Sequence, residues 1–267
     1  MNVRLARILD FWLGVPLCFV LSVFSRVREA IAPRRSRGSR GTVAGRKVLF
    51  VEFSEIGSAI MAYDAIKELL EALPGAEPFF WIFESNRPGV DVTGIVPKEK
   101  VLTVRDHHPL LFLADLAKGL RRIRKEKIDT VLDLELFSRF SAILCFLTGA
   151  PVRVGFHRYS MEGLYRGNLH THKVFYNPYR HISGNYMALV KALQAPHREV
   201  PCPKRVVRCG GDELPRLTPS PETRERVARM LADQQEREGV DHPEDEGELE
   251  QAACDVGEHV VVSVASH

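Results

Sequence analysis

Hydrophobic residues between residues 46 and 193 alternate between short unbroken runs and amphipathic stretches. The first run, 46–51, predicts a buried strand that leads into a polar turn with a single glycine, Gly57. After the turn, apolar residues recur with the spacing of one helix face: Ala62, Ile66, Leu69, Leu70 and Leu73. A strand, a tight turn and a helix in this order form a βα unit, whose turn lies at the carboxyl edge of a parallel sheet, where ligands bind.

Further strands and helices follow the same patterns along the chain. The predicted strands are 78–83, 100–104, 130–134 and 152–155, and the predicted helices are 108–128, 137–147, 183–193 and 222–238. Strands and helices that alternate in this way predict a parallel sheet covered by helices on both faces. The expected fold class is therefore α/β, with a Rossmann-like parallel sheet.

The amino terminus has a different pattern, an apolar stretch over residues 8–27 that is close to the length of a membrane span. A signal peptide would need a small-residue cleavage site, but an arginine cluster follows instead. A buried core helix is the other alternative. We favour a membrane-associated helix, spanning or half-inserted, whose arginines stay on the cytoplasmic side and bind anionic lipid. The expected location is the cytoplasmic face of the inner (plasma) membrane.

Five segments are expected from these patterns. Residues 1–31 form the membrane helix, 32–45 a basic linker and 46–194 the Rossmann-like domain. A linker with an acidic helix and loop follows at 195–258. The last segment, 259–267, is a β-branched run that predicts the first strand of a second, truncated domain.

The distribution of charge and the spacing of cysteines and histidines show which kinds of site to expect. Residues 1–47 contain ten Lys or Arg against two carboxylates, although the net charge of the whole chain is only +3. The five cysteines lack CxxC spacing, which fits a reducing compartment and argues against a zinc site. The adjacent pair His107 and His108 has no carboxylate partner in the sequence, so neither a metal nor a cofactor is expected.

The series of motifs resembles the amino-terminal half of the heptosyltransferase-like glycosyltransferases, glycosyltransferase family nine. The motifs are the βα turn with Glu55, Gly57 and Ser58, then 129–135 with Asp133 and Glu135, then 147–156, then the helix 183–193. The resemblance implies the GT-B arrangement of two Rossmann-like domains, of which this chain carries the acceptor-side one.

The resemblance also implies a reaction, the transfer of a sugar from a nucleotide donor such as ADP-heptose to a lipopolysaccharide-type glycolipid. In the family an aspartate directly after the turn glycine acts as the base, and Ser58 occupies that position here. A serine hydroxyl is too weak a base near neutral pH. Glu55 is the candidate replacement, against the alternatives that Glu55 is a solvated loop carboxylate and that Ser58 only caps the helix.

Substrate-binding candidates are Gly57 in the turn and the basic residues that follow the fifth strand. Arg153, His157 and Arg158 suit an anionic acceptor such as a phosphorylated sugar, and the open alternative is a set of exposed loop residues. His170 and His172, further on, belong to the same basic group. The expected partners are the nucleotide-sugar donor, the glycolipid acceptor and the membrane surface, with no nucleic acid.

Two function classes remain. One is a membrane-associated glycosyltransferase that is inactive as this fragment, and the other is a non-catalytic, membrane-tethered binding module with the same fold. A nucleotide-binding oxidoreductase is disfavoured because the turn lacks the second and third glycines of GxGxxG.

Overall fold

The computed structural model describes residues 8, 10–31, 47–136, 138–157, 165–193 and 221–238. The chain divides into two compact units, residues 1–214 and residues 215–267. In the second unit the described part is helix α10 (Pro221–Glu238), which matches the predicted helix 222–238. The expected basic linker and the expected carboxyl-terminal strand lie outside the described residues.

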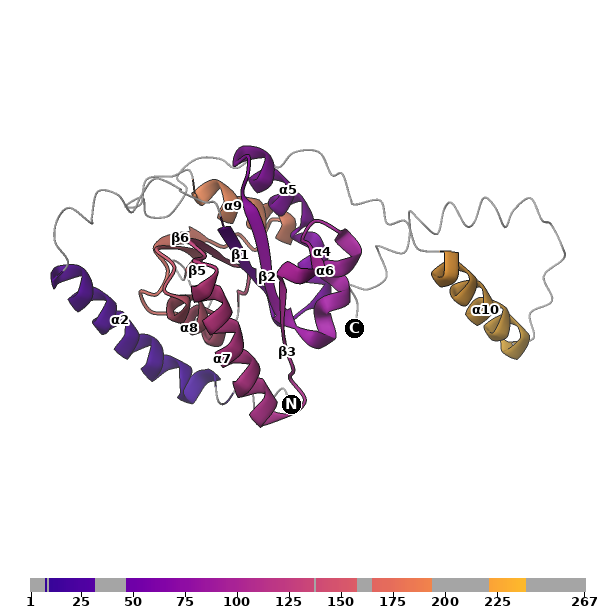
Figure 1. The fold of residues 1–267 in the computed structure, drawn as a ribbon, viewed down its shortest axis with the longest axis horizontal. Helices are drawn as coiled ribbons and strands as arrows, with labels where there is room; N and C mark the ends of the chain where they lie inside the picture. Colours follow the sequence, from indigo (N-terminus) through magenta and orange to yellow (C-terminus); the bar gives the residue numbers. More distant parts are fainter. Residues whose placement is uncertain are drawn as a thin grey trace. The chain divides into compact units, whose positions relative to one another are not determined.

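A six-stranded parallel sheet forms the centre of the first unit (Figure 1). Its strands lie in the order β3-β2-β1-β4-β5-β6. Their bounds are β1 Lys47–Val51, β2 Glu77–Phe83, β3 Val101–Val104, β4 Thr130–Asp133, β5 Val152–His157 and β6 His172–Phe175. This sheet confirms the predicted α/β fold and all five predicted strands. β6 was not predicted, because its HKVF sequence lacks an apolar run.

Helices cover both faces of the sheet. One face carries α4 (Ile56–Met61), α5 (Tyr63–Ala72), α6 (Arg87–Thr93) and α9 (Ile182–Ala192), and the other carries α7 (Pro109–Lys125) and α8 (Arg139–Thr148). Two short 3₁₀ turns, η1 (Glu84–Asn86) and η2 (Lys98–Lys100), flank α6. The helix predicted after the first turn is divided at Ala62 into α4 and α5.

The continuous apolar run of β1 follows from its central place in the sheet. Val48 and Phe50 belong to the core under α5 and α9, while Leu49 and Val51 belong to the core under α7 and α8. Because alternate side chains of a strand point to opposite faces, a strand covered on both sides is apolar at every position.

Helix α2 (Gly14–Ile31) packs on the outside of α8. Its buried Cys18 lies in a small core with Ala142 of α8 and Leu169. Within the described part of the chain, one helix, Asp10–Arg28, is long and apolar enough to cross a membrane. Its length and composition would allow a membrane span, while its contacts place it against the domain.

The strand order places β1 and β4 side by side at a switch in chain direction. From β1 the chain moves outward through β2 and β3, and it then returns to β4 on the other side of β1. In open parallel sheets the carboxyl ends of two such strands bound the crevice where ligands bind. The turn after β1 and the residues after β4 are therefore the place to look for a functional site.

Candidate functional site

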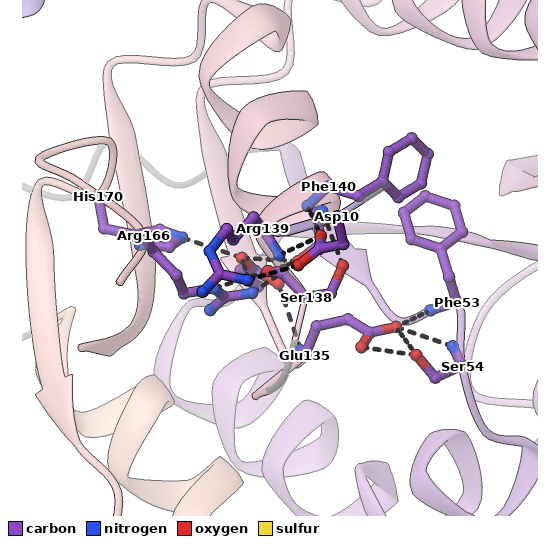
Figure 2. Close-up of polar contacts among 11 residues, drawn as sticks. Asp10, Phe53, Ser54, Glu135, Ser138, Arg139, Phe140, Arg166 and His170 are labelled. Atoms are coloured by element: carbon purple, nitrogen blue, oxygen red, sulfur yellow. Dashed lines mark hydrogen bonds and ion pairs between the residues drawn. The ribbon is translucent and has the colours of Figure 1, made fainter. Parts of the chain in front are cut away.

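Glu135 joins the ends of the two central strands (Figure 2). Its Oε1 accepts hydrogen bonds from the backbone N–H groups of Phe53 and Ser54, each at 2.8 Å, and from Ser54 Oγ at 2.7 Å. Ser54 Oγ lies at the same 2.7 Å from Oε2. Glu135 is 5% exposed, and it follows β4. One carboxylate thus fixes the β1–α4 turn across the switch point.

The same turn is held from the β2 side. Asn86, at the end of η1, donates from Nδ2 to the carbonyl oxygen of Phe53 at 2.7 Å. The Phe53 ring packs against Trp81 and Phe140 at centroid distances of 5.4 and 5.5 Å. The turn therefore has polar supports from two neighbouring strands and an aromatic support beneath, and Glu55 and Ile56 in it are exposed.

Glu55 and Ser58 lie together at the start of α4. Glu55 is the N-cap residue of α4 and is exposed, and Ser58 Oγ donates to Glu55 Oε2 at 3.1 Å. Ser58 is the third residue of the helix, so the interpretation of Ser58 as the helix cap is wrong. Gly57 stands beside them, and no atom lies within 4 Å of where its Cβ would be. The structure thus brings three predicted site residues together on an accessible turn.

Glu52 lies beneath this turn as a buried carboxyl group with 3% exposure. Burial raises the pKa of Glu52 well above its usual range, and the negative charges of Glu135 and Asp133 raise it further. Burial also raises the pKa of Tyr186 on α9, with a second contribution from Glu52, while a hydrogen bond to Ser58 acts in the opposite direction. The raised pKa favours the uncharged form of Glu52, which limits the negative charge under the turn.

A second polar group is buried on the opposite face, behind β4. Asp133 Oδ2 lies 2.9 Å from Arg166 Nη2 and 3.0 Å from His170 Nε2, and Ser141 Oγ donates to it at 3.2 Å. Burial opposes the ionised form of Asp133, yet Arg166 and His170 more than offset it and hold the pKa of Asp133 below its usual value. Burial lowers the pKa of His170, although Asp133 opposes the change. The group thus pairs one ionised carboxylate with one guanidinium in the core.

The basic residues predicted to bind an anionic acceptor do not meet in one place. Arg153 lies near the beginning of β5, where its Nε donates to Leu169 O at 2.7 Å and its guanidinium stacks 5.3 Å from the Phe146 ring. His157 lies at the carboxyl end of β5, half-buried, and burial lowers its pKa to about 4. Arg158 lies outside the described residues. Of the two described residues, His157 is at the edge that carries the turn.

His170 and His172 were grouped with these residues in the sequence, but the structure places both in the interior. They are 5% and 2% exposed, and His170 is bound to Asp133. Their burial fits neither a surface site for an anionic acceptor nor a set of exposed loop residues, because β6 pairs beside β5 at the edge of the sheet and carries this segment into the core. No group of three or more His, Cys, Asp or Glu residues able to hold a metal ion occurs in the part of the chain that the structure describes.

Several residues at this edge were not singled out as site residues in the sequence. Asp133 and Glu135 were placed correctly at the end of a strand, but their partners could not be identified, since Ser54 and Arg166 are far from them in the chain. Asn86 and Tyr186 gave no signal, because a polar residue after a strand and a tyrosine on a helix are common features. Gly155, a glycine inside a predicted strand, was the one feature of the sequence to indicate that another group packs closely against the backbone there.

The sequence matches no protein-family model and no curated protein. The fold is similar to that of solved glycosyltransferases. The E. coli ADP-heptose LPS heptosyltransferase II superimposes with a TM-score of 0.52 at 17% identity, over 69% of this chain and 50% of that one. The glycosyl transferase family 9 protein from Veillonella parvula DSM 2008 superimposes with a TM-score of 0.55 at 14% identity, over 77% of this chain and 53% of that one.

These similarities establish the fold, and they agree with the resemblance found in the sequence. The chain spans about half the length of the solved structures it matches. The described sheet and its helices therefore have a heptosyltransferase-like, family-nine glycosyltransferase fold, over about half of such a protein.

Proposed function

We propose that this chain supplies the acceptor side of a glycosyltransferase. The transferred sugar is heptose-like, the donor is a nucleotide sugar of the ADP-heptose type, and the acceptor is a lipopolysaccharide-type or other cell-envelope glycolipid. The observation that carries the proposal is the 3.1 Å contact between Glu55 and Ser58. It puts an exposed carboxylate beside the position where the family resemblance expects an aspartate, on a turn held at the switch point of the sheet.

Each residue of the turn has a role in this proposal. Glu55 takes the proton from the acceptor hydroxyl as that oxygen attacks the anomeric carbon of the donor. Ser58 donates to the Glu55 carboxylate and keeps it in one orientation. Glu135 and Asn86 hold the backbone of the turn in place, which matters because a displacement of about 1 Å can cost about 100-fold in rate.

The other half of the reaction needs groups that stabilise the departing diphosphate. Such electrostatic groups are worth about 10²–10³-fold each. The solved structures are about twice as long as the matched region, so we assign the nucleotide-sugar site to a domain beyond the described sheet. The 267-residue chain by itself is accordingly proposed to bind acceptor without transferring sugar.

The proposed location is the cytoplasmic face of the inner (plasma) membrane. A helix, Asp10–Arg28, long and apolar enough to cross a membrane supports it, together with the arginines that follow in the sequence. A glycolipid acceptor is held in the same membrane, so enzyme and acceptor share one surface.

Binding measurements test the proposal that this chain binds the acceptor and that a further domain binds the donor. The 267-residue chain should bind a lipopolysaccharide-core glycolipid in detergent micelles and should show no binding of ADP-heptose. Glu55→Gln, which keeps the size of the side chain, should bind the glycolipid like the native chain, because the proposed role of Glu55 is proton transfer. A chain that binds neither the glycolipid nor its phosphorylated sugar portion would contradict the proposal.

A further inference from the structure

Helix α2 turns its small residues toward the protein and its large apolar residues away from it. The buried positions are Gly14, Cys18, Ser22 and Ser25, which recur along one side of the helix. The exposed apolar positions include Phe19 and Val20 at 60% and Phe24 at 56% exposure, and Trp12, just before the helix, is 70% exposed. A water-soluble protein does the reverse and buries the large apolar face. Small residues at the contact and large apolar ones outside are typical of helices whose outer surface meets lipid.

The contact between α2 and the domain is specific along the helix. Just before the helix begins, Asp10 Oδ1 accepts from the backbone N–H groups of Arg139 and Phe140, and Asp10 Oδ2 lies 2.8 Å from Arg139 Nη1 (Figure 2). Arg139 is 6% exposed, so this pair is largely withdrawn from water. Asp10 therefore serves as a charged cap for α8 from another element.

The loop residues Gly167 and Asn168 fix the middle of the helix. Asn168 N donates to Ser22 Oγ at 2.6 Å, and Ser22 Oγ donates to the Cys18 carbonyl oxygen at 2.5 Å. Gly167 has a φ of +61°, and a Cβ there would lie 2.2 Å from Ser22 Oγ, so the close approach of the loop to α2 requires glycine. Helix α2 is therefore seated on the domain over about three of its turns.

A seated helix cannot cross a bilayer unless the domain enters the bilayer with it. The domain carries exposed cations such as Lys118 and Arg124 on α7, and burying charges in hydrocarbon is costly. We propose that α2 lies in the plane of the membrane, half-inserted into one leaflet of an anionic bilayer, with its large apolar residues in the lipid and its seated face on the domain. The inference rests on the membrane location proposed above and concerns how the helix lies there.

Basic residues at the margins of the apolar face of α2 support the proposal that this face contacts an anionic lipid surface. At about 100° per residue, Arg26 and Arg28 fall on opposite margins of the face that carries Val20, Phe24 and Val27. Both arginines are exposed. Long basic side chains at such margins reach the phosphate layer while the apolar face is in the acyl layer. Trp12, at the other end, suits the interface between the two layers.

The lipid contact also lies next to the candidate site. Phe140, whose N–H binds Asp10, packs its ring on Phe53 at 5.5 Å, and Phe53 begins the turn that Glu135 holds. Phe112 of α7 stacks on Phe140 at 5.7 Å, and its neighbours Leu110 and Leu113 are 72% and 61% exposed. Exposed apolar residues therefore lie both on α2 and at the start of α7, and Phe140 contacts both Asp10 and Phe112. A glycolipid in the same leaflet would meet the turn from this side.

Vesicle-binding measurements test whether the apolar face of α2 contacts anionic lipid. The full chain should bind phosphatidylcholine vesicles that contain phosphatidylglycerol, and it should bind vesicles of phosphatidylcholine alone more weakly. Val20→Glu should lower the affinity for anionic vesicles by about tenfold or more, because a valine leaves the acyl layer and a charge replaces it. Val92→Glu, at a residue of α6 with 49% exposure on the other face of the sheet, is the matched control and should bind like the native chain.

Depth measurements test the orientation. Quenching by brominated lipids measures the depth of Trp12 in the native chain. The same measurement is made on tryptophans introduced as Val20→Trp and Val27→Trp in a Trp12→Phe chain. All three tryptophans should lie at the same shallow depth. Trp81 is fully buried and should not be quenched. If the tryptophan at position 20 lies at the bilayer centre and those at positions 12 and 27 lie at opposite interfaces, the helix crosses the membrane and the in-plane arrangement is wrong. If the chain binds no vesicles, the proposal that lipid covers the apolar face of α2 is wrong. The assay contains no sugar, so its failure would leave the glycosyl-transfer proposal standing.

Discussion

The imidazole ring of His170 lies directly against Gly155, so closely that a Cβ on the glycine would stand 2.4 Å from His170 Nε2. Gly155 on β5 is the register partner of Asp133 on β4. The absence of a side chain at residue 155 opens the path by which His170 crosses β5 and reaches Asp133 at 3.0 Å. A glycine in a strand, which lowers strand stability by itself, thus makes a buried ion-pair group possible.

Gly155→Ala should destabilise the domain by about 1–3 kcal/mol, because the new methyl group forces His170 away from Asp133. Gly57→Ala is the matched control, since nothing lies within 4 Å of that Cβ and the residue is in a helix. Urea unfolding of both variants in the same detergent measures the difference. Equal stability of Gly155→Ala and the native chain would show that the His170 contact has no energetic value.

Glu135→Ala should lower the free energy of unfolding by about 1–3 kcal/mol, because it leaves the Phe53 and Ser54 N–H groups without their acceptor. Its effect on glycolipid binding should be larger than that of Ser54→Ala, which removes one hydroxyl and keeps both backbone bonds. Urea unfolding and micelle binding of the two variants give the comparison. If Ser54→Ala weakens glycolipid binding as much as Glu135→Ala does, the carboxylate does not hold the turn.

Asp10→Asn should weaken the seating of α2, because it removes a charge that pairs with the nearly buried Arg139. We expect a loss of about 1–3 kcal/mol in the free energy of unfolding. The exposed Glu71→Gln on α5 is the control and should cost almost nothing. An unchanged stability of Asp10→Asn would mean that the cap of α8 is supplied without the Asp10 charge.

The stability of the native chain should fall with rising pH because of Glu52. An unfolded glutamate has a pKa of about 4.3, and the pKa of Glu52 in the folded state is well above that value. The stability that protonated Glu52 contributes is complete below about pH 4 and is lost as the pH rises through the folded pKa. Glu52→Gln stays neutral, so its stability relative to the native chain should increase from pH 5 to pH 8. A constant difference across this range would show that Glu52 does not change its proton occupancy.

The sheet was largely predictable because each central strand is covered on both sides and is therefore apolar throughout. The exceptions have local reasons. β6 has two basic residues among four, and α6 starts with Arg87, Pro88 and Gly89, which are a turn signal in sequence. The division between α4 and α5 falls inside an unbroken amphipathic pattern, so periodicity could not reveal it.

Only the part of the candidate site that lies within one turn could be predicted from the sequence. Glu55, Gly57 and Ser58 are neighbours in sequence, and their turn follows a strand, so their meeting could be foreseen. The support from Glu135 joins residues about 80 positions apart, and no pattern along the chain encodes that pairing. Arg153 was expected at the ligand edge because it is basic and near a strand, but its place at the beginning of β5 puts it among the carbonyl groups of neighbouring loops.

Glycosyl transfer should be absent from the 267-residue chain alone and should appear when a nucleotide-sugar-binding domain is joined to it. ADP-heptose and a lipopolysaccharide-core acceptor are the substrates, and release of ADP is the readout. The native chain without the added domain is the control. Transfer by the 267 residues alone would contradict the assignment of the donor site to a further domain.

The most direct test of the central claim compares Glu55→Gln with Ser58→Ala in that joined, active protein. If Glu55 is the base, Glu55→Gln should reduce kcat by about 10²–10⁴-fold with little change in acceptor KM. Ser58→Ala should reduce it only a few-fold, since it removes a hydrogen bond of about 1 kcal/mol to the carboxylate. Equal and small effects of the two substitutions would remove Glu55 from the mechanism and contradict the account.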